Sequence, residues 1–360
     1  MRRRLAVLTS GGDAPGMNAA VRAVVLVGAD LGFDMVGVRS GYQGLMDADF
    51  VDLGPDDVVD LVRQGGTLLG SARCPAFMTR EGRDAARRRL ADARLDSLVV
   101  IGGNGSLAGA RALTAPEELG QQALAVAGIP ASIDNDIGHT RLAIGVDTAM
   151  NTIVEACDKI ADTAAAHDRA FIVEVMGRDC GYLAMATSVA AGADVVLFRE
   201  SGKSIETLVD EVTGALVELR RKGRRRALIV KAEGVQVSAA GLKERVDEAV
   251  AAKGLSVETR VTVLGHIVRG GRPSATDRLV ATRLGHAAVR ALAEGRTRVM
   301  ASWSPGRLPE GARWSSADPR CALVDLDDVL AETARLIDAE SPEARWRAQV
   351  FDRMGHVLRL

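Results

Sequence analysis

The chain has 360 residues, of which 47% are hydrophobic and 26% are charged. This composition is typical of soluble globular proteins, and the length is sufficient for two domains with sizeable cores. The net charge is −1 and aromatic residues make up 3% of the chain, so neither charge nor base stacking favours nucleic acid or an acidic membrane surface as a partner.

The four cysteines are widely spaced, with no CxxC pair and no histidine cluster beside them. This pattern indicates neither a zinc site nor a disulfide framework. No apolar stretch approaches the length of a membrane span, and the apolar run near the amino terminus is too short for a signal peptide. We therefore expect a soluble protein of the reducing cytoplasm.

The first predicted elements are an apolar strand over residues 5–9, a glycine-rich loop over residues 10–18 (SGGDAPGMN) and a helix over residues 19–30. A second strand over residues 35–38 and a loop over residues 41–44 follow. Glycines let backbone N–H groups approach an anion, and a helix amino terminus adds partial positive charge. The first loop is therefore a candidate phosphate cradle, although it is not a Walker loop. A tight turn without a ligand fits the loop alone equally well.

Residues 56–63 are predicted to form a helix that ends at two glycines. The loop over residues 67–75 (TLLGSARCP) contains one prominent basic residue, Arg73, which by itself is typical of a solvated surface. A charged helix over residues 83–93 contains three consecutive arginines at 87–89, and we expect these to form a solvated face.

A buried strand over residues 98–101 precedes the sequence GGNGS and a helix that begins near residue 107. This segment satisfies the looser dinucleotide fingerprint G-x-G-x-x-A, which favours a nicotinamide-dependent oxidoreductase. That fold also requires an acidic residue at the end of the next strand. The next predicted strand, over residues 123–129, contains no Asp or Glu, so this alternative fails its main test.

The sequence ASIDNDI over residues 131–137 follows that strand and Pro130. Asp134 and Asp136 are two residues apart and point to the same side if the backbone is extended. Open α/β sheets bind their ligands beyond the carboxyl ends of the strands. There, one carboxylate could accept a proton while the other holds a metal. A surface turn rich in Asp and Asn is the alternative interpretation.

The second half of the chain repeats the alternation of helices and strands. We predict helices over residues 148–165, 181–191, 205–222 and 276–293, and strands over residues 170–175, 195–198, 227–230 and 260–264. The alternation predicts an α/β fold of two similar domains, each a mostly parallel sheet flanked by helices. The first domain is expected over residues 1–145 plus about 273–300, and the second over 146–272 plus about 301–360.

Polar or glycine-rich clusters follow the predicted strands in both halves, and parallel sheets gather such clusters at one edge. The second half supplies Arg178, Arg260, His266 and Arg269, which are the residue types that bind anions. A phosphate cradle and carboxylates opposite arginines fit the transfer of a phosphoryl group to a phosphorylated acceptor.

Six sequences, SGGDAPGMN, GSAR, GGxGS, IDNDI, VEVMGR and VLGHIxRGG, occur in the order and spacing of the 6-phosphofructokinase family, which the chain resembles from residue 5 to about residue 285. The resemblance implies two α/β domains with the active site between them. It implies transfer of the ATP γ-phosphoryl group to the 1-hydroxyl of fructose 6-phosphate, with Mg²⁺, in glycolysis. It also implies a homo-oligomer, a tetramer or possibly a dimer, that shares sugar-phosphate sites between subunits.

The resemblance assigns a role to individual residues. Asp134 is the implied general base and Asp136 the implied metal carboxylate, with Asn104 as a second metal position. Gly12, Arg73 and Arg178 are implied to stabilise the transferring phosphoryl group. The nucleotide is implied to contact Gly11, Gly12, Tyr42, Arg73, Cys74, Gly103, Asn104, Gly105 and Ser106. The sugar phosphate is implied to contact Ser132, Asp134, Asp136, Met176, Gly177, Arg178, Glu233, His266 and Arg269, with Arg169 and Arg260 supplied by a neighbouring subunit.

Three positions depart from the family pattern. Asn104 replaces the Asp that ATP-using members carry, which should weaken metal or nucleotide affinity. Gly105 and Ala131 stand where pyrophosphate-using members carry Asp and Lys, which favours ATP as the donor. Ser132 replaces the usual Thr and keeps the hydroxyl.

The resemblance also implies that the effector site of regulated bacterial members is altered in this chain. Arg22 is kept, but Leu26 and Ala161 occupy positions that are usually basic. The basic run over residues 220–226 is compatible with an anion site and equally with a solvated helix end. We expect regulation to be weak or different. Other ketose phosphates, pyrophosphate as donor, and a catalytically weak sugar-phosphate-binding homologue remain as alternatives.

Overall fold

The computed structural model of the chain describes residues 3–119, 124–224, 226–306 and 308–358. They form two compact units. The first comprises residues up to 133, residues 137–148 and residues 269–334; the second comprises residues 134–136, 149–268 and 335 onward. The sequence-based division assigned residues from about 301 onward to the second domain, whereas residues 301–334 lie in the first unit.

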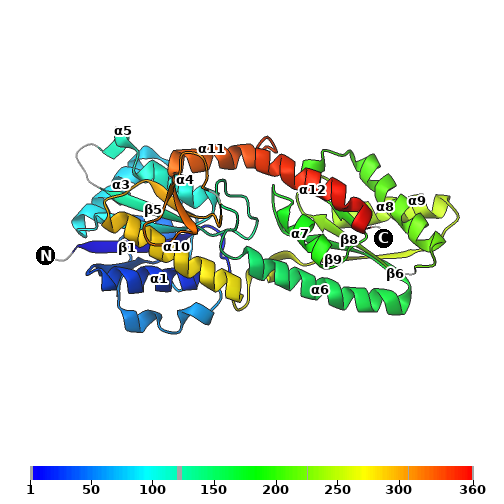
Figure 1. Ribbon diagram of the computed structural model, residues 1–360, viewed down its shortest axis with the longest axis horizontal. Coiled ribbons are helices and arrows are strands. Elements are labelled where there is room, and N and C mark those ends of the chain that lie inside the picture. Colours follow the sequence, from blue (N-terminus) through cyan, green and yellow to red (C-terminus); the bar gives the residue numbers. More distant parts are fainter. Residues whose placement is uncertain (1–2, 120–123, 225, 307, 359–360) are drawn as a thin grey trace. The chain divides into compact units, whose positions relative to one another are not determined.

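A sheet of eight described strands forms the centre of the first unit (Figure 1). In spatial order the strands are β11 (Arg313–Trp314), β12 (Cys321–Asp325), β10 (Val299–Trp303), β5 (Ala125–Pro130), β4 (Ser97–Gly102), β1 (Arg4–Ser10), β2 (Asp34–Val38) and β3 (Phe50–Leu53). The strands from β10 to β2 run parallel, while β12 and β3 pair antiparallel beside them. Every residue of β4 is buried, as expected of a parallel strand covered on both faces. The predicted mostly parallel α/β sheet is therefore confirmed.

Helices cover this sheet, and α1 (Met17–Asp30) packs against α10 (Ala275–Ala293) (Figure 1). Gly285 permits their close approach, because a Cβ there would lie 2.7 Å from the Cβ of Ala23. The remaining elements are α2 (Gly41–Asp47), α3 (Arg80–Asp92), α4 (Asn104–Leu113), α5 (Pro116–Leu119) and the 3₁₀ turns η1 (Pro55–Val58), η2 (Leu61–Arg63) and η3 (Pro75–Met78).

Two sequence predictions in this unit are wrong in detail. The segment over residues 56–63 forms two 3₁₀ turns rather than one helix. Its buried residues, Val58 and Leu61, lie one in each turn. The loop predicted over residues 41–44 is the first part of α2. Residue 123, which was predicted to start a strand, lies outside the described residues.

The second unit is built on a parallel sheet of four described strands, in the order β7 (Val195–Leu197), β8 (Ala227–Ala232), β6 (Arg169–Val175) and β9 (Glu258–Val263). Its helices are α7 (Tyr182–Ala190), α8 (Ile205–Arg221), α9 (Ala239–Ala252) and α12 (Pro342–Leu358), with a 3₁₀ turn η4 (Arg199–Ser201). Three elements begin in one unit and continue into the other: α6 (Val146–His167), η5 (Gly265–Arg269) and α11 (Leu326–Ile337).

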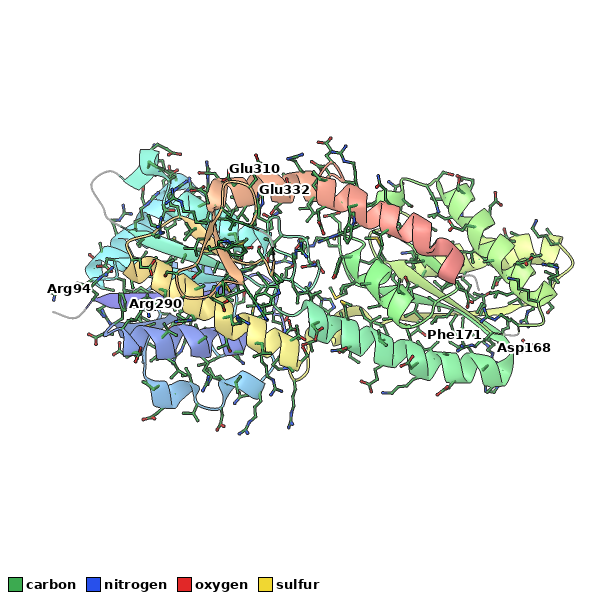
Figure 2. All side chains as sticks on the ribbon, in the orientation of Figure 1. Arg94, Asp168, Phe171, Arg290, Glu310 and Glu332 are labelled. Carbon is green, nitrogen blue, oxygen red and sulfur yellow. The ribbon has the colours of Figure 1, made fainter. Side chains whose placement is uncertain are left out.

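Serine residues fix the starts of α8 and α9. The hydroxyl of Ser204 accepts a hydrogen bond from the backbone N–H of Thr207, and that of Ser238 accepts one from Gly241. Each hydroxyl satisfies one of the N–H groups that a helix start leaves without an intrahelical partner. Figure 2 labels Phe171 in the amino-terminal part of β6 and Asp168, the residue before this strand.

Candidate active site

The predicted site residues fall into two groups, one in each unit. The first unit holds Gly11, Gly12, Tyr42, Arg73, Cys74, Gly103, Asn104, Gly105, Ser106, Ser132 and Arg269. The second unit holds Asp134, Asp136, Arg169, Met176, Gly177, Arg178, Glu233, Arg260 and His266.

The loop after β1 is tied to its neighbours through Gly11. Gly11 has a φ of 86°, in the left-handed region that glycine adopts without strain. Its carbonyl accepts a hydrogen bond of 2.7 Å from the Ser71 hydroxyl. A Cβ on Gly11 would lie 3.2 Å from the Oγ of Ser106. The loop over residues 10–18 therefore lies against both the loop of Arg73 and the first turn of α4.

The loop that carries Arg73 is fixed by its backbone. The hydroxyl of Thr9 donates a 2.8 Å hydrogen bond to the carbonyl of Gly70, and the N–H of Leu68 donates one of 2.6 Å to the Asn18 side chain. Arg73 itself is exposed and forms no hydrogen bond or ion pair among the described residues. Cys74, half-buried, precedes η3. A rigid backbone thus presents a guanidinium that is available to an anion.

Helix α4 begins at Asn104, three residues earlier than predicted, with Gly103 as its N-cap. Its first N–H groups lack intrahelical partners, so this end of the helix favours negative charge. Asn104 is half-buried and Gly105 is exposed. A Cβ on Gly105 would meet nothing within 4 Å. The helix start therefore has both the donors and the open space that a phosphate chain requires.

Tyr42 supports this helix from inside the unit. Its hydroxyl donates a 2.6 Å hydrogen bond to the Ser106 carbonyl, and its ring stacks on Phe77 with 4.1 Å between the centroids. A Cβ on Gly109 would lie 2.7 Å from the Tyr42 ring. Burial raises the pKa of Tyr42 above its usual range. The visible role of Tyr42 is to hold α4, and a nucleotide contact stays a prediction.

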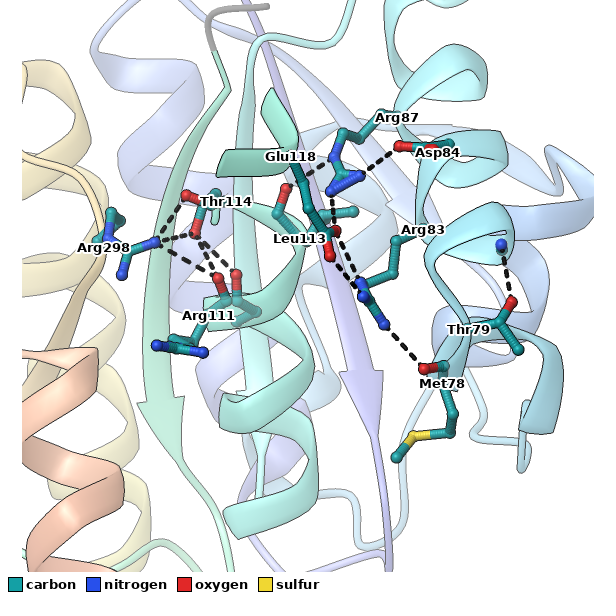
Figure 3. Close-up of polar contacts among 12 residues, drawn as sticks. Met78, Thr79, Arg83, Asp84, Arg87, Arg111, Leu113, Thr114, Glu118 and Arg298 are labelled. Carbon is teal, nitrogen blue, oxygen red and sulfur yellow. Dashed lines mark hydrogen bonds and ion pairs between the residues drawn. The ribbon is translucent and has the colours of Figure 1, made fainter. Parts of the chain in front are cut away.

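An ion-pair cluster holds α3 against α5 (Figure 3). The Glu118 carboxylate accepts hydrogen bonds from Arg83 and Arg87, and Arg87 also donates to the carbonyl of Leu113 at 3.2 Å. Hydrogen bonding from Arg83 lowers the pKa of Glu118 to about 2. Arg87 is 3% exposed, which corrects its prediction as part of a solvated face; Arg88 and Arg89 are exposed as predicted.

The cluster after β5 lies beside the cluster after β4. The register pairs Gly102 with Pro130, and the N–H of Ala131 donates a 3.0 Å hydrogen bond to the Gly102 carbonyl. A Cβ on Gly103 would lie 3.8 Å from the Cβ of Ser132. Ala131 is 1% exposed. The predicted meeting of these two clusters at one sheet edge is present in the first unit.

Arg269 reaches the loop after β1. Its Nη1 donates a 3.2 Å hydrogen bond to the Asp13 carbonyl. A Cβ on Gly12 would lie 2.7 Å from the same Nη1. Gly12 therefore has a structural reason to be glycine: its bare backbone leaves room for the guanidinium.

The Asp134–Asp136 turn belongs to the second unit. Asp134 is 6% exposed, Asn135 is fully buried, and Asp136 is half-buried. Asn135 has a φ of 51°, an uncommon conformation for a residue with a side chain. Its carbonyl accepts a 3.2 Å hydrogen bond from Nη1 of Arg347 in α12. The sequence analysis did not find Arg347, and no local pattern marks it, because the two residues are 212 positions apart.

The turn after β6 is held by Glu233. One carboxylate oxygen, Oε1, accepts hydrogen bonds from the backbone N–H groups of Gly177 at 3.2 Å and Arg178 at 2.7 Å. Arg178 has a φ of 47°. A Cβ on Gly234 would lie 2.1 Å from the Arg178 carbonyl. Glu233 thus orients the Arg178 backbone, and its contact to the sugar stays a prediction.

A buried ion pair supports the same end of the sheet. Lys231 is fully buried at the end of β8, and its ammonium donates hydrogen bonds of 2.9 Å to Glu174 and 3.1 Å to the Ala232 carbonyl. Met176, 8% exposed, follows β6. These contacts make the carboxyl edge of the sheet a firm base for Arg178.

Arg169 lies away from that edge, at the start of β6, and Arg260 lies midway along β9. Arg169 is the first residue of β6 and donates to Glu258 at 2.5 Å, and Arg260 pairs with the same carboxylate. At about 3.3 Å per residue, Arg169 is roughly 20 Å from the carboxyl end of its strand. Within one chain, Arg169 therefore cannot act beside Arg178.

His266 is exposed in η5. Among the residues considered for an effector site, Arg22 is half-buried, Arg220 pairs with Asp168, and Arg221 pairs with Glu218 at 2.7 Å. Arg225 lies outside the described residues. The pairing of Arg220 and Arg221 favours the interpretation of this run as a structural helix end.

No group of three or more His, Cys, Asp or Glu side chains that could hold a metal ion occurs among the described residues. Mg²⁺ is usually bound through one or two carboxylates together with substrate phosphates. Asp136 provides such a carboxylate and Asn104 an amide oxygen. Asn104 lies in the first unit and Asp136 in the second, and a role of either at a metal stays a prediction.

Comparisons with known proteins identify the family of this chain. A model of the family described as phosphofructokinase matches residues 4–292. The chain belongs to the phosphofructokinase family. It is 46% identical over 298 residues to the ATP-dependent 6-phosphofructokinase of Thermotoga neapolitana, covering 83% of this chain and 89% of that protein. It is 43% identical over 334 residues to ATP-dependent 6-phosphofructokinase 1 of Thermus thermophilus, covering 91% of this chain and 99% of that protein.

Solved phosphofructokinase structures share the fold. The structure of the Saccharomyces cerevisiae enzyme matches with a TM-score of 0.82 at 35% identity, over 96% of this chain and 48% of that chain. The Pichia pastoris enzyme in its T-state matches with a TM-score of 0.85 at 32% identity, over 99% of this chain and 42% of that chain. This chain thus spans about half the length of either yeast chain. None of its described helices is both long and apolar enough to cross a bilayer.

Proposed function

We propose that the protein is an ATP-dependent 6-phosphofructokinase, which transfers the ATP γ-phosphoryl group to the 1-hydroxyl of fructose 6-phosphate in glycolysis. The observation that carries this proposal is the 43–46% identity, over most of the chain, to relatives named ATP-dependent 6-phosphofructokinase. The phosphate-binding backbone of the first unit, and the carboxylates and Arg178 of the second unit, support it.

The first unit binds the donor. The loop of Gly11 and Gly12 and the start of α4 present backbone N–H groups to the phosphates. The exposed guanidinium of Arg73 offsets charge on the transferring group. Gly105 leaves open space at the helix start, which favours a nucleotide over pyrophosphate.

The second unit supplies the base. Asp134 accepts the proton of the 1-hydroxyl as the oxygen attacks the γ-phosphorus, the bond to the β-phosphate oxygen breaks, and ADP leaves. Arg178, on a backbone oriented by Glu233, stabilises the charge that spreads over the phosphoryl oxygens. When bound, Mg²⁺ neutralises nucleotide phosphate charge, and Asp136 with Asn104 are the residues that would hold it.

The acceptor's 6-phosphate is bound by His266 and Arg269. Arg169, at the start of β6, and Arg260, midway along β9, contact the acceptor of a neighbouring subunit. This arrangement requires a homo-oligomer, which we propose to be a tetramer or a dimer in the cytoplasm.

A coupled assay matrix tests the proposal: ATP and pyrophosphate as donors, each with fructose 6-phosphate, tagatose 6-phosphate and sedoheptulose 7-phosphate. We expect the highest kcat/KM with ATP and fructose 6-phosphate. Activity with pyrophosphate alone would overturn the assignment of the donor. Asp134→Ala is expected to abolish turnover while ATP binding, measured by calorimetry, is retained; unchanged turnover would rule out Asp134 as the base.

A further inference from the structure

Arg347 is a buried charge outside the segment that defines the family. It lies in α12, beyond residue 292, where the family match ends. The residue is 5% exposed. Burying a guanidinium is costly unless its charge and its N–H groups are compensated, so its partners indicate what it is for.

The partners of Arg347 lie on three segments of the second unit. Its Nε donates a 3.1 Å hydrogen bond to Glu343 one turn earlier in α12, and its Nη1 donates to the Asn135 carbonyl at 3.2 Å. The same Nη1 lies 3.7 Å from the Cys180 sulfur, and the guanidinium carbon lies 4.7 Å from the centre of the Tyr182 ring. One side chain therefore contacts the Asp134–Asp136 turn and the turn that carries Arg178.

The contact to Asn135 is the informative one. Asn135 is fully buried with a φ of 51°, a conformation that costs free energy and persists when the surroundings impose it. It stands between Asp134 and Asp136, so its backbone conformation sets the direction of both carboxylates. A charged donor on its carbonyl is a strong restraint.

The contacts to Cys180 and Tyr182 join this turn to the start of α7. The N–H of Cys180 donates a 2.8 Å hydrogen bond to the Gly177 carbonyl, which closes the turn around Arg178. Burial raises the pKa of the Cys180 thiol to about 12, so Cys180 is a neutral packing partner. Arg347 thus bridges the segments of the proposed base and of the proposed charge-stabilising arginine.

We infer that Arg347 is a positioning residue that holds the Asp134–Asp136 turn in the conformation required for proton removal. The inference rests on the proposed function. A role in fastening α12 alone is the alternative, and it predicts lower thermal stability without a specific effect on the turn or on kcat.

The test compares Arg347→Gln and Arg347→Lys with Arg345→Gln in the full-length protein. Arg345 is a matched control, since it is exposed on the same helix and, among the described residues, its side chain donates to the Glu340 carbonyl alone. In the Arg347 variants we expect kcat to fall about ten- to hundredfold, the scale of a misplaced catalytic group. The KM for ATP should change less than kcat, because the proposed donor-binding residues other than Asp136 lie in the first unit. Arg345→Gln should leave both constants unchanged.

Hydrogen exchange provides a readout that does not depend on activity. We expect faster exchange in the peptide containing residues 134–136 of Arg347→Gln, with no change in peptides from β1 and β4. Added methylguanidinium should partly restore kcat in Arg347→Ala. A lower Tm with unchanged kcat and unchanged exchange at residues 134–136 would overturn the inference. If Arg347→Gln and Arg347→Ala do not fold, the kcat, Tm and hydrogen exchange of Arg347→Lys are judged in the same way. A wild-type protein inactive in every assay would refute the proposed function, while hydrogen exchange would still decide the role of Arg347.

Discussion

The Oε1 atom of Glu233 lies 2.7 Å from the backbone nitrogen of Arg178 and accepts its hydrogen bond. Arg178 has a φ of 47°, a conformation that costs about 1–2 kcal/mol for a residue with a side chain. The carboxylate therefore helps to hold a strained turn, and the guanidinium direction depends on it.

We predict that Glu233→Ala lowers kcat about ten- to hundredfold, because the charge-stabilising arginine loses its orientation. Glu233→Gln keeps an acceptor oxygen, so its kcat should fall much less than that of Glu233→Ala. Steady-state kinetics of both variants make the comparison. Equal losses of kcat in the two variants would indicate that kcat depends on the negative charge of Glu233 and not on its hydrogen bonds to the turn.

Gly12→Ala is predicted to raise the KM for the sugar phosphate about tenfold or more. The added Cβ would lie 2.7 Å from Nη1 of Arg269, so the guanidinium must move, and a phosphate contact of this kind contributes about 1.5–3 kcal/mol. Gly214→Ala is the matched control, because a Cβ there meets nothing within 4 Å. An unaltered KM in Gly12→Ala would exclude Arg269 from the acceptor site.

Hybrid oligomers test whether subunits share the site. Asp134→Asn and Arg169→Ala are each expected to be poorly active at low sugar-phosphate concentration. In a mixed oligomer, an intact Arg169 of one subunit completes the site of a neighbour whose Asp134 is intact. We expect co-expressed, doubly tagged hybrids to exceed the summed activity of the two parents. Activity no greater than that sum would place each site within one chain.

Glu118→Gln is predicted to lower the free energy of unfolding by about 1–2 kcal/mol at pH 7, after allowance for solvent screening. The pKa of Glu118 is lowered from 4.5 to about 2 in the folded state, so its stabilisation is complete above about pH 4.5 and is lost as the pH falls toward 2. Urea unfolding of both proteins measures the difference, which should shrink below pH 4.5. Glu155→Gln removes an exposed ion pair within one helix. This control substitution should lower the free energy of unfolding very little.

The sequence predicted β1, β2 and β4 to β9, most of which are largely apolar runs, but it did not predict β3, β10, β11, β12, α11 or α12. It also predicted the clustering of residues 102–106 and 131–132, which follow neighbouring parallel strands. The start of α4 was misplaced, since Gly103 and Gly105 lower helix propensity in its first turn. The burial of Arg87 and the contact of Arg347 depend on segments distant in sequence, and no local periodicity encodes them.

The two units are interleaved along the chain, and this affects how the protein is made. Residues 269–334 complete the first unit and residues from 335 onward contribute to the second, so neither can finish folding while those segments are still inside the ribosome. Asn135 emerges long before Arg347. The contact of Arg347 with the turn that carries Asp134 can therefore form only when nearly the whole polypeptide has been synthesised. We expect nascent chains that stop before α12 to show no phosphoryl transfer.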